Sequence, residues 1–488
     1  MKKVLYPNIW GEGALFAVSG YDGKTDFSFE LLAKLLGDRA GLSIYTGSES
    51  GVSPSAEFWI ESDGCGLPAY DKEQSIVSGD FIELTFKAGK IYFSAVDCRT
   101  FTGFCGSENT RFILKSAAGG KEEARKNIVF IKTGKGFIAA SATAAKRTEF
   151  YLPAYEFKGK FAVTLGKSRK ECRVRLKQAL ANNADLSQAA KNKTSFTGLL
   201  PDFINRLKDN KIRRTAAKAV SVLKVNVQSP YKIVPLRWTT PDRLPHHDMW
   251  LWDSAFHSMG WSYLDTRMAS DAICAVFKTQ RRNGFIPICA RHKGNQTQPP
   301  ILAWSVWHLY TLTKDESLLR QTYEKLANFL GYFEKNRREK KTGLYFWKKE
   351  MNRICRAGES GLDNSPLYDG KKKQLSCDLS SYMANSFELL AKMAEVLEKD
   401  RESRAWREKY KKLKSAMNKL LWDGRTGFYY DREINGQLLA EKSATGFYPL
   451  FAGVVSKPRA AALLKHLKNK EEFWTAFPVP TVSRESAR

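Results

Sequence analysis

Apolar and polar residues alternate along much of the first third of the chain. In the segment 82–95, apolar residues occupy every second position on both sides of a turn at Ala88 and Gly89. Successive side chains of a β-strand point to opposite faces, so this alternation predicts a β-hairpin with one apolar face. A second hairpin is predicted at 128–141, where glycines separate two alternating runs. Many short strands joined by glycine turns predict a β-sandwich over residues 1–166.

The composition changes after the last of these strands. Residues 167–200 are rich in Lys, Arg, Ala, Leu and Gln, and the alternation with period two is lost. These residue types favour helix. We therefore expect a helical linker between the β-sandwich and the rest of the chain.

Beyond residue 200 the apolar positions recur every three or four residues, which is the period of an amphipathic helix. Nine segments follow this pattern: 212–223, 250–264, 267–281, 300–313, 319–333, 379–397, 406–420, 443–452 and 458–467. Helices of this length, joined by loops that alternate between short and long, suit an α/α toroid, in which helix pairs surround a central bowl. The sequence thus predicts a multidomain β + α protein whose residues 201–488 form a toroid.

Two carboxylates lie four residues apart in one segment of the helical half. Glu359 and Asp363 stand there beside Gly361, Asn364 and Pro366. A loop of this composition can hold an acid rigidly over a ligand. Loop carboxylates also cap helices or face water, so this segment by itself does not assign a function.

Aromatic residues gather upstream of that segment. Trp250 and Trp252 flank a leucine and precede Asp253, and Gln298 precedes two prolines and Trp304. Sugar recognition needs flat apolar surfaces for C–H faces and fixed polar groups for hydroxyls, and these residues offer both. Two residues apart on a helix, the indoles would point in different directions, so we expect them in a loop or at a helix start. Burial of both indoles in the core is the alternative.

These segments, in this order, resemble the catalytic domain of trehalase-like and processing-glucosidase-like glycoside hydrolases. The resemblance is greatest to the mannosylglycerate-hydrolase branch related to glycoside hydrolase family 63, and it covers residues 200–488. Residues 1–166 are more loosely similar to the β-rich domain that often precedes such domains. The resemblance implies the twelve-helix (α/α)6 barrel, catalysis without a metal or other cofactor, and α configuration of the substrate.

The family's motifs also imply roles for individual residues. Asp363 matches the general acid, whose pKa must be raised by burial or by a neighbouring carboxylate such as Glu359. The expected substrate-binding residues are Trp250, Trp252, Asp253 and Gln298, with Glu359, Asn364, Arg243, His257 and Trp304 as further candidates. His257 considered alone suits a structural histidine better than a substrate-binding one. An inverting enzyme places its two carboxyl groups roughly 6.5–9.5 Å apart.

The chain departs from the family's pattern near its end. The second carboxylate of the family, the base, is a glutamate close to the C-terminus, and no residue here matches it. Neither Glu441 nor Glu485 is assigned that role. Since nine helices are also three fewer than twelve, we expect a C-terminally truncated sequence.

The formal net charge is +28, with Lys and Arg spread over both halves of the chain. Basic runs at 335–341 and 371–373 lack any nucleic-acid-binding motif, so a solvated surface is the favoured explanation, with an anionic substrate or adventitious nucleic-acid affinity as alternatives. No G-x-S-x-G elbow or glycine-rich phosphate loop is present. The eight cysteines are scattered, which suggests free thiols in a reducing cytoplasm. No apolar run approaches the roughly 20 residues that span a bilayer.

The sequence therefore predicts a cytoplasmic, inverting α-glycoside hydrolase that acts on a small α-glucoside or α-mannoside. We expect no metal, no cofactor, and neither nucleic acid nor membrane as a partner. A non-catalytic carbohydrate-binding protein, or an inactive fragment of a glycosidase, is the alternative. The sugar, the aglycone and the oligomeric state are not fixed by the sequence.

Overall fold

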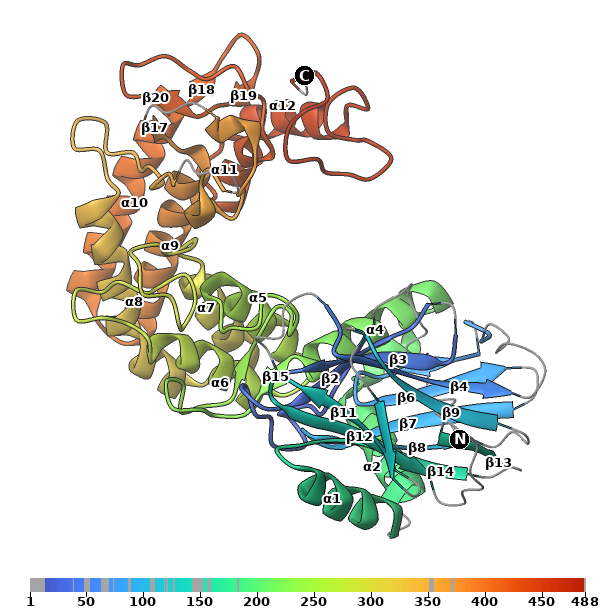
Figure 1. Ribbon diagram of the computed structural model, residues 1–488. Helices are drawn as coiled ribbons and strands as arrows, with labels where there is room; N and C mark the ends of the chain where they lie inside the picture. Colours follow the sequence, from blue (N-terminus) through green and yellow to red (C-terminus); the bar gives the residue numbers. More distant parts are fainter. Residues whose placement is uncertain are drawn as a thin grey trace. The chain divides into compact units, whose positions relative to one another are not determined.

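The computed structural model describes residues 14–486, except for residues 38, 48–52, 63–69, 73, 87–88, 106–109, 118, 120–121, 126–127, 143–151, 156–158, 182–183, 351–354 and 370–372. The chain divides into two compact units (Figure 1), unit 1 with Met1–Asp248 and Tyr263–Asp265, and unit 2 with Met249–Ser262 and Thr266–Arg488. The sequence had placed the start of the catalytic domain at residue 201. By its contacts, the segment 201–248 belongs instead to unit 1.

Unit 1 contains two antiparallel sheets. The first has the order β1 (Leu15–Phe16), β2 (Leu31–Leu35), β3 (Gly41–Thr46), β4 (Ala56–Ser62), β9 (Thr110–Ser116) and β13 (Leu152–Tyr155). The second has the order β10 (Glu122–Arg125), β11 (Ile128–Thr133), β12 (Gly136–Ala142), β14 (Gly159–Gly166), β8 (Thr100–Cys105), β7 (Gly89–Asp97), β6 (Phe81–Phe86) and β5 (Ile76–Val77). The pairs β6–β7 and β11–β12 confirm both predicted hairpins.

The two sheets enclose one apolar core. Phe58 and Ile60 of β4 and Phe161 and Val163 of β14 belong to it, and each is at most 1% exposed. Removing such side chains from water stabilises the fold by about 1.5–3 kcal/mol each. The apolar residues that alternate along the strands are therefore the ones that face this shared core.

The first two helices of unit 1 form a further layer on the outer face of the eight-stranded sheet. Unit 1 has the helices α1 (Arg169–Ala181), α2 (Ala184–Leu199), α3 (Asp202–Arg206) and α4 (Asn210–Val225), and the short strands β15 (Val227–Gln228) and β16 (Trp238–Thr239). Phe130 of β11 and Ala162 of β14 pack against Cys172 and Leu176 of α1. The segment 167–200, predicted as a helical linker, contains α1 and α2. Helix α1 packs on the sheet and so belongs to the β-sandwich unit.

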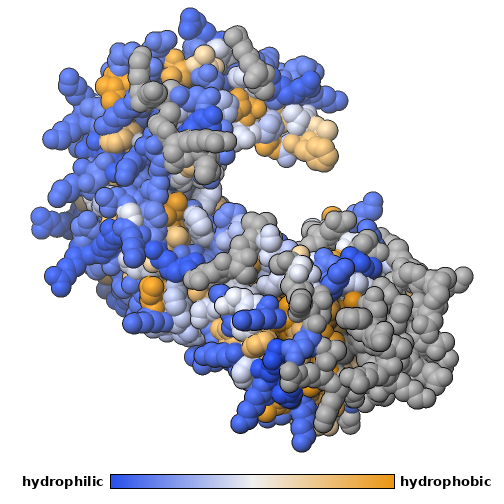
Figure 2. All heavy atoms as spheres, viewed as in Figure 1, coloured by the Kyte–Doolittle hydropathy of each residue, from blue (hydrophilic) through white to orange (hydrophobic). Residues whose placement is uncertain are grey.

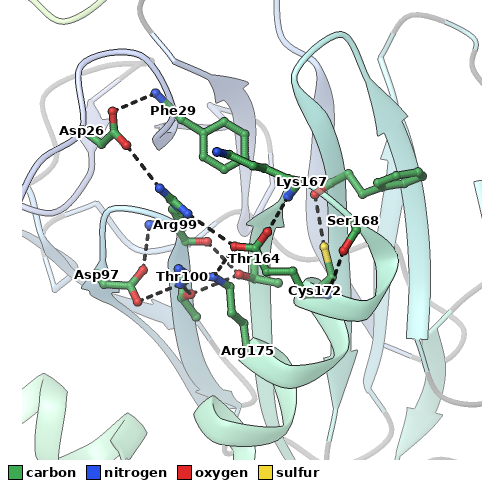
Figure 3. A network of polar contacts seen from close by, with 12 residues as sticks. Asp26, Phe29, Asp97, Arg99, Thr100, Thr164, Lys167, Ser168, Cys172 and Arg175 are labelled. Atoms are coloured by element: carbon green, nitrogen blue, oxygen red, sulfur yellow. Dashed lines mark hydrogen bonds and ion pairs between the residues drawn. The ribbon is translucent and has the colours of Figure 1, made fainter.

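Polar contacts also hold α1 on that sheet (Figure 3). Arg175 donates from Nη1 to Asp97 Oδ2 over 3.1 Å and to Thr100 Oγ1 over 3.4 Å. Arg99 donates from Nη2 to Asp26 Oδ2 over 3.2 Å. Both arginines of this network thus face a carboxylate, which gives the network a structural role.

Unit 2 is mainly helical. Its helices are α5 (Leu251–Trp261), α6 (Thr266–Phe277), α7 (Leu302–Thr313), α8 (Glu316–Asn336), α9 (Cys377–Val396), α10 (Asp400–Leu420), α11 (Tyr448–Phe451) and α12 (Lys457–Lys468). It also contains the 3₁₀ turns η1 (Gly358–Ser360), η2 (Pro366–Tyr368) and η3 (Ala444–Phe447), and the strand pairs β17 (Gln374–Leu375) with β20 (Arg432–Glu433) and β18 (Trp422–Asp423) with β19 (Phe428–Tyr429). Each of the nine predicted segments contains a helix, although 443–452 holds only η3 and the single turn α11.

The longer helices of unit 2 form two rows. Contacts connect α5, α7, α9 and α11 in succession, while α6, α8 and α10 pack on the helix that precedes each of them. Helix α9 buries 15 of its 20 residues, whereas α10 buries three of 21, so α9 lies in the inner row and α10 in the outer one. In Figure 2, hydrophilic side chains cover the face over α8 and α10. In the described part of the chain, no helix combines the length and apolar character needed to cross a bilayer.

Candidate active site

Residues 357–365, here called the acid loop, carry Asp363. The loop contains η1, in which Ser360 N donates to Ala357 O over 3.0 Å, and then turns at Gly361 with a φ of 74°. A Cβ at Gly361 would lie 2.4 Å from the indole of Trp252, so the backbone approaches the ring as closely as only glycine permits. Asp363 is exposed at the end of this turn. The loop therefore packs against the first aromatic residue of α5 through Gly361, two residues before its exposed acid.

Glu359 connects the acid loop to three neighbouring segments of unit 2. Its carboxylate is 0% exposed and accepts from Arg337 Nη2 at 2.6 Å and from Arg337 Nε at 3.0 Å. It also accepts from the backbone N–H of Thr297 at 3.3 Å and of Lys348 at 3.0 Å. Both oxygens are thus fully used within the protein. The prediction that Glu359 binds substrate is wrong, because this carboxylate is buried in a bidentate ion pair.

Three consecutive residues connect the acid loop with the start of α5. Gln296 Nε2 donates to Glu350 Oε1 over 2.7 Å, Thr297 N donates to Glu359, and Gln298 Oε1 accepts from Trp252 N over 3.2 Å. The first N–H groups of a helix lack partners within it, so Gln298 satisfies one of them at the start of α5. The amide of Gln298, which is 4% exposed, thereby fixes Trp252 relative to this segment.

The carboxylate near Asp363 is Glu350. A Cβ at Gly358 would lie 3.7 Å from Glu350 Oε2 and 4.0 Å from Asp363 Oδ1, so the two carboxylates flank the same glycine. Burial, together with the charges of Asp363 and Glu350, raises the pKa of the neighbouring Cys355 thiol to about 11. A like charge favours the protonated form of a carboxyl group. Glu350 occupies the place that the sequence had given to Glu359.

Aromatic rings follow the inner row of helices. Trp252 meets Phe256 edge to face at 5.8 Å, Phe256 meets Trp304 at 6.2 Å, and Trp304 meets Phe451 at 4.8 Å between ring centroids. The series continues through Tyr382 to Tyr448. We call these six residues the aromatic row. Trp252 and Trp304 are half-buried and Phe256 is 43% exposed, so these rings remain partly accessible.

Trp250 and Trp252 lie at a helix start, as their spacing predicted. Trp250 is the N-cap residue of α5 and forms an isolated β-bridge with Cys289. Asp253 stands in the first turn of α5, where a carboxylate is favoured by the helix dipole. The structure thus joins Trp252, Gln298 and the acid loop directly, with Trp250 and Asp253 in the same helical turn.

The other candidate residues have different surroundings. Arg243 is 0% exposed inside unit 1, where its guanidinium donates to Glu30 Oε2 at 2.5 Å and to Val18 O at 2.8 Å. Its assignment to substrate binding is therefore corrected to a structural one. Burial lowers the pKa of His257 on α5 to about 4, which leaves that imidazole neutral at pH 7. Asn364 is exposed and accepts from Arg356 Nη1 at 3.5 Å.

The hollows of about 180, 320 and 600 Å³ in the described part of the chain are lined by none of these candidate residues. One concave pocket shared by Trp250, Trp252, Asp253, Gln298 and Asp363 stays a prediction. Among the described residues, no three His, Cys, Asp or Glu side chains are arranged to hold a metal ion.

The sequence did not single out two carboxylates of unit 2, Asp378 and Asp431. Both are essentially inaccessible, at 1% and 2% exposure. Burial and the charge of Asp431 raise the pKa of Asp378 to about 8, and burial raises the pKa of Asp431 to about 6. In the sequence, Asp378 looks like an ordinary acidic residue in the first turn of a helix. Nothing in the sequence around Asp378 predicts that this residue is buried.

Comparison with known proteins provides independent information on this chain. The family model described as "Mannosylglycerate hydrolase MGH1-like glycoside hydrolase domain" matches residues 245–488. An uncharacterized protein of Borreliella burgdorferi is 28% identical over 184 residues, which are 38% of this chain and 36% of that protein. The mannosylglycerate hydrolase of Thermus thermophilus is 24% identical over 327 residues, covering 50% of this chain and 75% of that enzyme. The chain thus spans only about a third of the first of these relatives.

Among solved structures, a bacterial glucoamylase complexed with acarbose matches with a TM-score of 0.58 at 13% sequence identity. The match covers 96% of this chain and 81% of that chain. At this identity the likeness concerns the fold alone. It extends over both the β-rich and the helical part of the chain.

Proposed function

Because the chain belongs to the family of mannosylglycerate hydrolase MGH1-like glycoside hydrolase domains, we propose that it hydrolyses the glycosidic bond of a small α-mannoside or α-glucoside. The observation that carries this proposal is the acid loop, in which Gly361 packs against the indole of Trp252 and Asp363, two residues further on, is exposed. An acetal needs a proton on its leaving oxygen to break at neutral pH, and a carboxyl group in such a loop can deliver it.

In this proposal Asp363 is the general acid. The bidentate pair of Glu359 with Arg337 fixes the loop, so the carboxyl group of Asp363 needs little reorganisation when the substrate binds. The carboxylate of Glu350 flanks the same glycine, Gly358. A fixed position is one of the two requirements of a general acid, and the other is that it carries a proton when the substrate binds.

The aromatic row gives the sugar its binding surface. Trp252 and the exposed ring of Phe256 offer flat apolar faces to the C–H groups of a pyranose ring, and Asp253 at the start of α5 offers hydrogen-bond acceptors to its hydroxyls. We further propose that the two rows of helices are part of an (α/α)6 toroid, in which the inner helices surround the substrate. Inversion requires a second carboxylate, about 6.5–9.5 Å from the acid, that activates water. The sequence assigns no residue of this chain to that role.

A carbohydrate-binding protein without turnover is the second candidate. It is favoured by one observation, the lack of a residue that matches the family's base. Both candidates predict sugar binding at the aromatic row, so turnover distinguishes them.

The test follows hydrolysis by proton NMR. The purified chain is incubated with mannosylglycerate, methyl α-mannoside and methyl α-glucoside, and the anomeric signals of the released sugar are recorded before mutarotation. We expect the β anomer to appear first from one of these substrates. Release of the α anomer would contradict inversion, and binding of a sugar without any release would favour the carbohydrate-binding candidate.

A further inference from the structure

Asp378 and Asp431 lie together in the interior of unit 2, next to the segments that flank the acid loop. Asp378 stands in the first turn of α9, and Asp431 follows β19. The charge of Asp431 acts on Asp378, while Asp431 accepts from Cys377 N, the residue before Asp378, over 2.8 Å. Two carboxylates in one buried site repel each other strongly when both are ionised. The site therefore favours a state in which the two share one proton.

Asp378 contacts the segments on both sides of the acid loop. On the side that precedes the loop, Trp347 Nε1 donates to Asp378 Oδ1 over 2.9 Å, and the next residue, Lys348, donates its N–H to Glu359. On the side that follows the loop, Tyr368 Oη donates to Asp378 Oδ2 over 3.4 Å. One carboxylate thus connects both flanks of the segment that carries Asp363.

Asp431 holds the second flank through Gln374. Gln374 Nε2 donates to Asp431 Oδ2 over 2.9 Å and to Leu367 O over 3.3 Å, so it joins Asp431 to the turn η2. Lys349 Nζ donates to Gln374 Oε1 over 2.6 Å, which fixes the orientation of this amide. The turn η2 is therefore held by Asp378 through Tyr368 and by Asp431 through Gln374.

The hydrogen-bond donors determine which carboxyl group carries the shared proton. Both oxygens of Asp431 accept from N–H groups, which cannot reverse their direction, so Asp431 is the ionised member. Oδ2 of Asp378 faces the hydroxyl of Tyr368, which can accept as well as donate. A protonated Asp378 can therefore keep every one of its contacts.

The groups that face this pair come from four elements. They are Lys349 before the acid loop, Tyr368 of η2, Cys377 and Tyr382 of α9, and Tyr448 of α11. Burial raises the pKa of the three tyrosines and of the cysteine, so these four stay neutral between pH 6 and pH 9. Burial lowers the pKa of Lys349, and the negative charges of Asp369 and Glu433 act in the opposite direction. Apart from the pair itself, Lys349 is the group to be controlled for.

We propose that Asp378 and Asp431 are a positioning pair, which shares one proton and releases the acid loop when the second carboxyl group ionises. The inference rests on the proposed function in one respect, the catalytic use of the acid loop. The pair and its contacts do not depend on that function. In the shared-proton state the loop is held on both flanks. In the doubly ionised state the repulsion in this buried site is relieved by moving one carboxylate, and the contacts with Trp347 and Tyr368 are lost.

The direction of the pH dependence follows from Asp378. Its pKa is raised from 3.8 to about 8 in the folded protein, so the folded state retains a proton that the unfolded chain has already lost. Stability contributed by the pair therefore decreases as the pH rises from about 4 to about 8, and it changes no further above pH 8, where the folded protein has lost this proton too. We expect the loop to open progressively as the pH rises towards 8.

The test is hydrogen exchange of the full chain between pH 6 and pH 9, corrected for the intrinsic rate, in the peptide that covers 357–368. In the unmodified protein the protection of this peptide falls by up to about tenfold per pH unit between pH 6 and pH 8, and it levels off above the pKa of the pair. In Asp378→Asn it stays constant, because the amide accepts from Trp347 and donates to Tyr368 as the protonated acid does. Asp378→Ala has low protection at every pH. Glu408→Gln, an exposed carboxylate on α10, is the matched control and behaves as the unmodified protein.

These outcomes separate the pair from other causes. If Asp378→Asn keeps the pH dependence of the unmodified protein, the transition belongs to Lys349 or to the loop itself, and the proposal is overturned. It is equally overturned if the unmodified protein has no transition. Should Asp378→Ala fail to fold, the comparison with Asp378→Asn decides alone. None of these readouts requires turnover, so failure of the proposed hydrolysis would leave this result unaffected.

Discussion

Gly361 determines how close the acid loop comes to Trp252. Its φ of 74° lies in the left-handed region, and a Cβ there would lie 2.4 Å from the indole. Gly361→Ala should therefore destabilise the protein by about 1–3 kcal/mol through backbone strain and steric conflict. Urea unfolding measures this change.

Gly331 provides the matched control for that substitution. It lies in the middle of α8, and a Cβ there would meet no atom within 4 Å. Gly331→Ala should stabilise the protein by about 0.5–1 kcal/mol, because alanine is the better helix residue. Equal effects of the two substitutions would contradict the close approach of Gly361 to Trp252.

Glu359 stabilises the loop through a buried ion pair. Glu359→Gln leaves the guanidinium of Arg337, of which 9% is exposed, without a counter-charge. Removal of one member of a buried pair costs about 3–5 kcal/mol, whereas an exposed helix pair such as Glu316 with Arg320 contributes about 0.3–0.5 kcal/mol. Unfolding of Glu359→Gln and of Glu316→Gln should differ accordingly. If Glu359→Gln lowers the free energy of unfolding by less than Glu316→Gln does, the buried pair does not stabilise the loop.

Individual residues were predicted from the sequence with uneven success. The spacing of the two indoles limited them to a loop or a helix start, and Trp250 is the N-cap of α5. The burial of Arg243 against Glu30 did not, because the partner lies 213 positions away in the sequence. The role of Glu359 was wrongly predicted for the same reason. The sequence does not show whether a carboxylate near a candidate acid faces a sugar or pairs with an arginine, here Arg337.

At the scale of elements, α5 and α7 bring the rings of the aromatic row together. Phe256 is 43% exposed on α5, between Trp252 and Trp304. If the row binds the sugar, Phe256→Ala should weaken binding by about three- to tenfold, since an aromatic contact contributes about 0.5–1.5 kcal/mol. Calorimetric titration with methyl α-mannoside measures this change.

Leu312 on α7 is a suitable control, because it is 47% exposed and does not belong to the aromatic row. Leu312→Ala should bind the sugar as the unmodified protein does. If the two variants bind equally well, the sugar binds elsewhere.

Periodicity predicted the elements better than their placement. The strands of both hairpins and the nine helical segments followed from repeats of two and of three to four residues. The segment 167–200 was predicted as a connector, because its composition is polar and its apolar positions are few. Cys172 and Leu176, four residues apart, are the signal that α1 has a face to bury, and they contact Phe130 and Ala162 of the sheet.

At the scale of the whole chain, the net charge of +28 is the main feature without a functional role. Helix α10 in the outer row carries many Lys and Arg residues and buries only three positions. Cations on such a surface are separated by water and screened by salt, with a Debye length of about 8 Å at physiological ionic strength. A solvated surface, as predicted from the sequence, is consistent with the exposure of this helix.

The central claim is that Asp363 donates the proton in glycoside hydrolysis, and Asp363→Asn tests it most directly. The variant is compared with the unmodified protein on an alkyl and on a 2,4-dinitrophenyl glycoside of the same sugar. Asp369→Asn, an exposed carboxylate six residues away, serves as the control. We predict that Asp363→Asn loses about 10²–10⁴-fold in kcat on the alkyl glycoside, whose leaving group needs a proton, and far less on the activated one. An equal loss on both substrates, or no loss on either, would contradict the assignment of Asp363 as the general acid.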